Sequence, residues 1–304
     1  MKNTGSCLRR IRWLAIFLLS APAFAAEESD ADWFKNIFSS GEYVAETVYV
    51  GEATVRRGNR SVTDFSENDT TLRFVLTPRT KIGILRLGLE WERFSFDFPD
   101  QTPLPNTLQS GSLILGLDTQ LSDSILLRVE ARPGFYGTND FEWSNFNAPF
   151  IAGGSYIYNP NLQFIAGVSV DVERKYPVLP GAGIRWKFAP QWVANAVLPA
   201  PRLEYEATKD LKFYVGGVFK GTNFRVSDNF GDTHGRNTAL NRAVLSYSEV
   251  RTGVGMNWKL TSFLTLTAEA GYQPYRSFDF YRADVRFHED GSAPYGAISL
   301  HGAF

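Results

Sequence analysis

The stretches Glu249–Lys259 (EVRTGVGMNWK) and Leu264–Gln273 (LTLTAEAGYQ) alternate apolar and polar residues over their whole length. In the second stretch one parity holds Leu, Leu, Ala, Ala and Tyr, and the other holds Thr, Thr, Glu, Gly and Gln. Successive side chains of a β-strand point to opposite faces, whereas a helix of 3.6 residues per turn would mix the two sets. Both stretches are therefore predicted to be β-strands with one apolar face.

The same alternation recurs along most of the chain, with turn residues between the segments. The predicted strands are 43–56, 69–77, 81–96, 109–121, 124–135, 148–158, 161–174, 181–188, 210–220, 243–259, 263–275 and 294–304. Pro199 and Pro201 interrupt the stretch between 188 and 211, and proline cannot donate to a strand ladder. That stretch is either two short strands or one interrupted segment, so the count is about 12 strands, with 14 as the alternative.

Strand length and loop length favour a membrane barrel over a soluble sandwich. The two quoted stretches match the ~9–11 residues that a tilted strand needs to cross the hydrocarbon layer. Tight turns near 77–80, 121–124, 158–161, 188–191 and 260–262 alternate with longer polar loops at 57–68, 97–108, 137–147, 221–242 and 276–293. The predicted fold is all-β, a closed antiparallel transmembrane β-barrel, because outer-membrane barrels have short turns at one end and long loops at the other.

Aromatic residues flank the predicted strand ends, as expected at the two surfaces of a membrane. One predicted girdle contains Tyr156, Tyr158, Trp186, Phe188, Trp192, Trp258 and Phe263, and a far one contains Trp91 and Phe94. Amphipathic rings prefer the level of the lipid headgroups, so these residues should point outward.

The first 25 residues have the pattern of a secretory signal peptide. Basic residues precede the apolar run Trp13–Leu19 (WLAIFLL), and Ala23-Phe24-Ala25 fits the small-x-small cleavage rule. The run is too short to span a bilayer as a helix. We predict three parts: a signal peptide (1–25), an N-terminal periplasmic segment (26–40) and a transmembrane β-barrel (41–304), placed in the outer membrane of a Gram-negative cell.

Composition excludes several classes of function. The formal net charge is −1, with 31 Lys and Arg against 32 Asp and Glu, and no basic stripe indicates nucleic-acid binding. The single cysteine, Cys7, lies in the predicted signal peptide, so the mature chain holds no thiolate metal site. We expect no cofactor, no metal and no nucleic-acid partner.

The last residue, Phe304, ends an alternating segment. A C-terminal Phe in this setting resembles the signal that the barrel-assembly machinery reads, and closure requires the last strand to pair with the first. Predicted partners are therefore this machinery and periplasmic chaperones during assembly, and outer-membrane lipid afterwards.

These features together resemble a known family. The cleaved signal, the alternating strands, the segment Leu198–Tyr205 (LPAPRLEY) and the terminal Phe304 are similar to an uncharacterised family of Gram-negative outer-membrane β-barrel proteins, a domain of unknown function. The resemblance implies fold and compartment, and it implies no activity.

Charged residues on the polar parity of the strands should face the barrel lumen. They are candidates for setting solute selectivity: Arg86, Glu90, Glu92, Asp118, Arg128, Glu130, Arg132, Asp171, Glu173, Arg185, Lys187, Glu249, Arg251 and Glu269. Inward charges require water or ion pairs, because isolated charges are costly at low dielectric. The favoured prediction is a passive channel for small polar solutes. The alternatives are a structural or interaction barrel with a closed lumen and, less favoured, a lipid-modifying enzyme.

Few residues suggest catalysis. Ser299 and His301 lie two residues apart on one strand face, but their parity points into the lumen rather than toward lipid, which favours a polar pair over a hydrolase site. His234 and His288 lie in predicted polar loops beside acidic residues, without the spacing of a metal site. We predict that the chain is not an enzyme.

Overall fold

The structure is a computed structural model that describes residues 40–99, 102–139, 141–234 and 237–304. The predicted signal peptide, and all of the predicted N-terminal segment except residue 40, lie outside the described residues. In the described residues, eighteen strands form one sheet. Their bounds are β1 (Gly41–Arg57), β2 (Arg60–Leu76), β3 (Arg79–Thr80), β4 (Gly83–Asp97), β5 (Thr107–Ser122), β6 (Ile125–Ala131), β7 (Gly134–Gly137), β8 (Phe146–Asn147), β9 (Phe150–Asn159), β10 (Leu162–Val170), β11 (Val178–Ala189), β12 (Trp192–Val197), β13 (Arg202–Glu206), β14 (Leu211–Arg225), β15 (Val244–Lys259), β16 (Leu264–Phe280), β17 (Val285–Asp290) and β18 (Ala293–Ala303).

The sheet closes into an antiparallel barrel of fourteen wall strands. β2 with β3, β6 with β7, β8 with β9 and β17 with β18 each lie end to end along one wall strand. β18 pairs with β1, and the terminal Phe304 exchanges two backbone hydrogen bonds with Gly41, so the predicted closure is confirmed. The count of fourteen arises because the stretch with Pro199 and Pro201 forms two short strands, β12 and β13.

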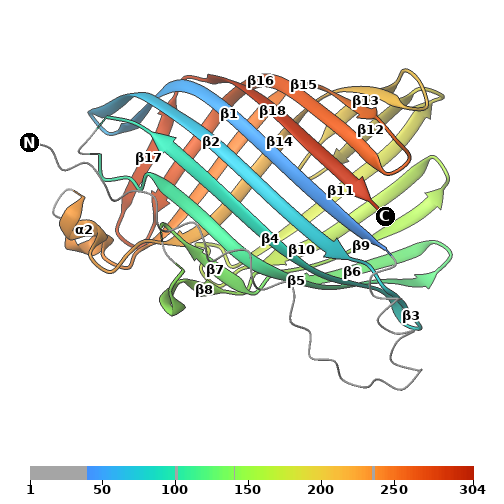
Figure 1. Cartoon of the computed structure of the whole chain (residues 1–304), viewed down its shortest axis with the longest axis horizontal. Helices are drawn as coiled ribbons and strands as arrows, with labels where there is room; N and C mark the ends of the chain where they lie inside the picture. Colours follow the sequence, from blue (N-terminus) through green and yellow to red (C-terminus); the bar gives the residue numbers. More distant parts are fainter. Residues whose placement is uncertain (1–39, 100–101, 140, 235–236) are drawn as a thin grey trace, which may run out of the picture. The chain divides into compact units, whose positions relative to one another are not determined.

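The barrel has two different ends, which we call the turn end and the loop end. Short turns such as 123–124, 160–161 and 190–191 lie at the turn end, together with β3 and the C-terminus (Figure 1). The loop end carries the segments 98–99, 102–106, 138–139, 141–145, 171–177, 226–234 and 237–243, with the short helices η1 (Trp143–Asn145), α2 (Phe230–Thr233) and η2 (Thr238–Leu240). No helix in the described part of the chain has the length and apolarity needed to cross a membrane.

Two of the predicted loops are wrong, because strands continue through them. β1 and β2 meet at a tight turn in which Gly58 has φ +56°, so the predicted loop 57–68 is mostly strand. Glycine adopts this φ without steric cost, and Gly58-Asn59 is a hairpin signal. The predicted loop 276–293 contains the end of β16 and all of β17. In both stretches the outward residues are polar, while inward residues such as Phe65, Phe278 and Phe287 are apolar and buried, so the alternation in hydrophobicity inverts while the strand continues.

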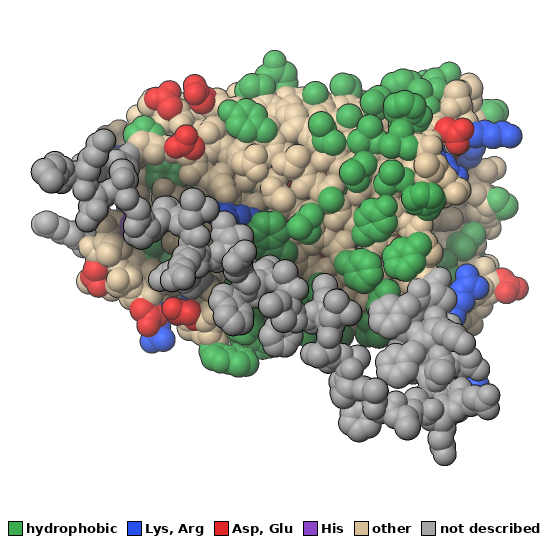
Figure 2. Space-filling view, viewed as in Figure 1, with side chains coloured by type: hydrophobic (Ala, Val, Ile, Leu, Met, Phe, Trp, Pro, Cys, Tyr) green, Lys and Arg blue, Asp and Glu red, His purple; other side chains and the backbone are tan. Residues whose placement is uncertain are grey.

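The outer wall is apolar, as the alternation predicted. Leu89 and Val254 are 60% and 61% exposed on this face. Figure 2 shows hydrophobic side chains across the visible wall and Asp and Glu near the loop end. The aromatic residues predicted near the turn end, including Trp186 and Phe263, are exposed. Phe94 is an exception and that prediction is wrong: it is fully buried inside the barrel, since it shares the inward face of β4 with Glu90 and Glu92.

The loop half of the interior is filled by an apolar core. Phe94 from β4 packs on Tyr247 from β15 and on Phe224 from β14, with ring centroids 4.9 and 6.1 Å apart. Leu104 and Leu240, from two segments at the loop end, join the same fully buried cluster. Rings contributed from opposite walls and loops that fold inward therefore close the barrel at this level.

Candidate functional site: the barrel interior

The turn half of the interior is polar and reached by solvent. We call it the vestibule and define it by the inward side chains of Glu42, Asp118, Arg128, Lys187, Glu206 and Lys212. The Arg128 side chain is 53% exposed and that of Glu42 49% exposed, although both face the inside of the wall. Charges at this level therefore contact water as well as each other, which lowers the free-energy cost of placing them inside the barrel.

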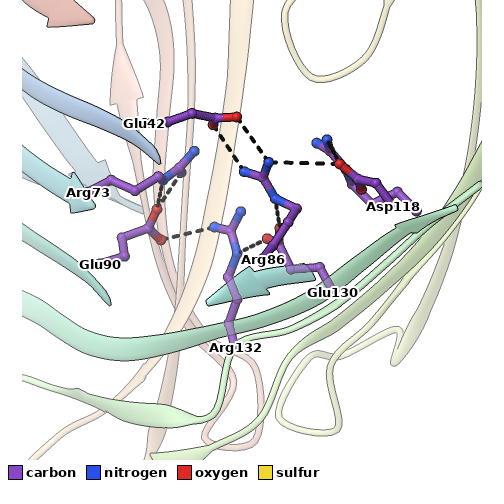
Figure 3. Close-up of polar contacts among 8 residues, drawn as sticks. Glu42, Arg73, Arg86, Glu90, Asp118, Glu130 and Arg132 are labelled. Atoms are coloured by element: carbon purple, nitrogen blue, oxygen red, sulfur yellow. Dashed lines mark hydrogen bonds and ion pairs between the residues drawn. The ribbon is translucent and has the colours of Figure 1, made fainter. Parts of the chain in front are cut away.

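Five adjacent wall strands carry a connected ion network in and above the vestibule (Figure 3). Arg86 on β4 lies 3.2 Å from Glu42 on β1 and 3.3 Å from Glu130 on β6. Arg132 bridges Glu130 at 2.8 Å and Glu90 at 2.9 Å. The Arg86 and Glu130 side chains are buried, and each has more than one partner of opposite charge, which limits the penalty of removing them from water.

The remaining charged members of this network are more exposed. Arg128 forms a bidentate pair with Asp118, with N–O distances of 2.6 and 2.7 Å, and Arg73 pairs with Glu90. Near the turn end Glu206 on β13 accepts from Lys187 at 2.6 Å and from Lys212 at 2.8 Å. Two cations around one carboxylate leave this part of the vestibule net positive.

A second polar group crosses the barrel beneath the apolar core. Lys220 on β14 lies 2.6 Å from Asp69 on β2 and 2.7 Å from Glu92 on β4, strands on the other side of the interior. Arg276 on β16 lies 2.8 Å from Glu67 and 3.2 Å from Glu289, and its side chain is completely buried. The Lys220 pairs tie opposite walls together, whereas Arg276 joins β16 to the adjacent β17 and to the nearby β2, and both groups occupy the lumen.

Tyrosines hold the remaining inward carboxylates of this region. The Tyr247 hydroxyl lies 2.8 Å from carboxylate oxygens of both Glu67 and Glu249. Glu249 also accepts from Gln273 and lies 3.3 Å from Arg251. Glu269, lower on β16, accepts hydrogen bonds from the hydroxyls of Tyr214 and Tyr295.

A further contact fastens the loop end, and we call it the latch. Asp171, which follows β10, accepts from the side-chain amides of Asn147 at 2.9 Å and Asn223 at 2.5 Å. Glu173 pairs with Arg225. The latch thus connects the end of β10 with β8 and with the upper part of β14.

The latch shows that β14 turns into the barrel. Lys220 and Phe224 face inward, so alternation assigns Asn223 and Arg225 to the outer face of β14. Their partners Asp171 and Glu173 have the inward parity of β10. The outer face of β14 therefore meets the inner face of the barrel wall across from it. Arg225 of β14 forms a parallel bridge with Gly137 of β7 in that wall.

All fourteen predicted lumen residues share the polar parity, and the structure divides them among different settings. Seven belong to the turn-half network or pairs: Arg86, Glu90, Asp118, Arg128, Glu130, Arg132 and Lys187. Glu92, Glu249, Arg251 and Glu269 lie with the Lys220 and tyrosine groups, and Asp171 and Glu173 form the latch. Arg185 is different, because it has no ion pair within the described part of the chain.

Sequence reasoning missed several partners. Glu67 and Arg276 were not predicted to face the lumen, because they lie in the two stretches wrongly predicted as loops. Glu42, Arg73, Asp69 and Lys220 lie in predicted strands or at their margins, and extending the parity of those strands could have found them. No parity rule could have shown which inward charges pair across the barrel.

The candidate catalytic residues face the interior. Ser299 Oγ and His301 Nε2 lie 2.8 Å apart on β18, as a polar pair on the wall. Within the described residues, no group of three or more His, Cys, Asp or Glu side chains could hold a metal ion. That the chain is not an enzyme stays a prediction.

Comparison with known proteins places the chain in a family. The model of a domain of unknown function, DUF6268, matches residues 33–291, and no curated protein matches. Among solved structures, the barrel is similar to the KdgM porin in complex with disordered oligogalacturonate (9% identity, TM-score 0.36, 87% of this chain and 99% of that one). It is also similar to the NanC porin (9%, 0.40, 86% and 98%) and to the P. putida toluene transporter TodX (8%, 0.44, 87% and 90%). The chain belongs to the DUF6268 family.

Proposed function

We propose that this protein is a passive channel for small polar solutes in the outer membrane, with a loop end that is closed in this structure. The observation that carries the proposal is the solvent-exposed set of inward charges in the vestibule. A barrel that served only as a scaffold would gain more stability from an apolar interior than from charges held at a wet wall. Water-filled lumens lined by charge conduct and select ions and polar solutes.

Closure at the loop end has two components. The apolar core around Phe94 and Tyr247 fills the loop half of the interior, and the latch joins the end of β10 to β8 and β14. Conduction therefore requires the latch to open, and the resting protein should conduct rarely.

A structural or interaction barrel is the second candidate. The filled loop half favours it, because the Lys220 ion pairs bind opposite walls together and the buried Arg276 pairs hold β16 to β17 and β2, and both would resist opening. The two candidates differ in one measurable property, the passage of ions.

Reversal potentials in planar bilayers under a KCl gradient test the channel. Replacing both Lys187 and Lys212 by Gln removes two positive charges and leaves Glu206 unpaired, so the reversal potential should shift toward that of a cation-selective pore. The matched control is Lys81→Gln in the exposed turn between β3 and β4, which should leave the potential unchanged. Bilayers that stay silent with correctly folded protein would instead support the structural barrel.

Assembly in the outer membrane is a further proposal, tested at Phe304. Its ring stacks on Phe74 at 6.1 Å, and its backbone pairs with Gly41. Phe304→Ala should lower the amount of folded barrel in cell envelopes several-fold while refolding in detergent stays efficient, because the backbone pairing survives. Phe74→Ala, which removes the ring partner only, is the control. Equal losses in cells and in detergent would show that Phe304 acts through stability alone.

A further inference from the structure

The wall of the barrel is interrupted between β11 and β14. The intervening β12 and β13 have six and five residues, against twelve in β11 and fifteen in β14. On its β12 side, β11 pairs only from Gly183 onward, so residues 178–182 have no strand partner there among the described residues. β14 pairs with β13 only up to Gly216, and Gly217 and Phe219 then donate to the carbonyls of Pro201 and Pro199.

The inward turn of β14 separates the two edges further. Its upper part lies against the inner face of β8 and β10 through the latch, so it does not continue the wall beside β11. Above the short β12–β13 hairpin, β11 and β14 are therefore not joined by strand pairing, and we call this unpaired stretch of the wall the side opening.

On the inner side of this stretch the lumen is open. A Cβ atom built on Gly181, which shares the inward face of β11 with Arg185, would have no atom within 4 Å beyond its own chain neighbours. The exposed residues around the side opening are apolar: Val178 and Leu179 on β11, Leu198 after β12, and Phe219 on β14, which is 47% exposed. We call these four residues the rim.

Prolines lie on both sides of the side opening. Pro180 lies in the free part of β11, and Pro199 and Pro201 lie in the β12–β13 connection. Proline has no N–H, so each removes a donor that an unpaired edge would otherwise expose in or near lipid, where unsatisfied backbone groups are costly. This explains the segment that sequence alone left unassigned.

Arg185 lies on the inner side of the same strand. It shares the inward face of β11 with Gly181 and is four residues nearer the turn end, which is about 13 Å along a strand at ~3.3 Å per residue. Arg73, Arg86 and Arg128 all have carboxylate partners, whereas Arg185 has none among the described residues. Its neighbours across the strands are Gln163 and Asn195, which carry no charge.

We propose that the side opening admits a single-chain anionic amphiphile from the surrounding lipid, with its apolar chain against the rim and its charged head on Arg185. Apolar residues at the opening and an uncompensated guanidinium deeper inside match the two ends of such a molecule. This route is separate from the polar path of the proposed function, and it requires no ion conduction.

The first test locates the opening. The predicted mature chain has no cysteine, so single cysteines can carry a fluorophore in bilayers whose acyl chains are brominated. A label at Gly181→Cys should be quenched, as should one at the outward, lipid-facing Val129→Cys. A label at Ser155→Cys, on the inward face of β9 in the turn half, should not be quenched. If Gly181→Cys behaves like Ser155→Cys, lipid does not reach the opening and the proposal fails.

The second test measures binding of decanoate to the protein in zwitterionic nanodiscs, after subtraction of binding to empty nanodiscs. Arg185→Gln should weaken binding about tenfold, the size expected for loss of a charge-assisted contact, and decanol should bind the wild type as weakly as decanoate binds the variant. The control Arg56→Gln removes an exposed arginine already paired with Asp290 and should not change binding. Equal affinity in wild type and Arg185→Gln would overturn the proposal. A silent planar bilayer would not, so the two proposals fail separately.

Discussion

Arg276→Ala should lower the free energy of unfolding by about 3–5 kcal/mol, the usual cost of leaving buried charges without their partner. Arg276 is completely buried and pairs with Glu67 and Glu289, which are themselves buried. Its guanidinium also lies 4.7 Å from the centre of the Phe65 ring, so the side chain supports the apolar core as well. Urea unfolding of the barrel in detergent micelles, followed by tryptophan fluorescence, measures the change.

A surface pair at the same end of the barrel provides the control. Arg56 and Asp290 lie 2.8 Å apart, and both side chains are about half exposed, so Arg56→Ala should cost no more than about 1 kcal/mol. Adding Glu67→Gln to Arg276→Ala should recover part of the loss, because it removes one of the stranded carboxylates. If Arg276→Ala and Arg56→Ala lower the free energy of unfolding by similar small amounts, the loop half is not a rigid, buried core.

Asp171→Ala should raise the permeability of the barrel by at least about tenfold. Asp171 accepts two side-chain hydrogen bonds from Asn147 and Asn223 and one from the backbone N–H of Glu173. Hydrogen bonds to a charged group contribute about 1.5–3 kcal/mol each, and a loss of 1.4 kcal/mol already changes a two-state population tenfold. Swelling of proteoliposomes in a small uncharged sugar measures the increase.

Further variants test whether Asp171 acts through the latch. Asn223→Ala should raise swelling in the same direction, and combining it with Asp171→Ala should add little, because both act on one contact. Asp290→Ala removes an exposed carboxylate at the loop end and should leave swelling at the wild-type rate. Unchanged swelling in Asp171→Ala would mean that the apolar core alone closes the barrel.

The wall of the barrel could be predicted from the sequence because burial on one strand face imposes a strict period of two. Leu264–Gln273 shows this clearly, and each of the twelve predicted segments became a wall strand or part of one. The pattern misleads where the apolar face changes sides. In β16, Phe278 and Phe280 face the packed core inside the barrel, whereas the polar Ser277 and Asp279 lie on the opposite strand face.

The interior could be predicted only in part. Parity placed Arg86, Asp171 and Glu249 inside, but it cannot say which charges lie across the lumen from one another. For the same reason, the sequence could not predict the inward turn of β14. Asn223 and Arg225 have the parity of outward residues. Only their contacts with Asp171 and Glu173 show that they are covered. The prolines near β12 indicated an irregularity, but not that the wall opens beside them.

Single-channel recording of the folded wild-type protein in planar bilayers tests the channel account most directly. Folding is verified first by the heat-dependent shift in gel mobility that a stable barrel shows in SDS. The wild-type protein should show discrete, infrequent steps of uniform size, because a hydrated vestibule lies behind a loop end that is closed in this structure. Complete silence of the folded protein, in the wild type and in Asp171→Ala alike, would contradict it and identify a structural barrel.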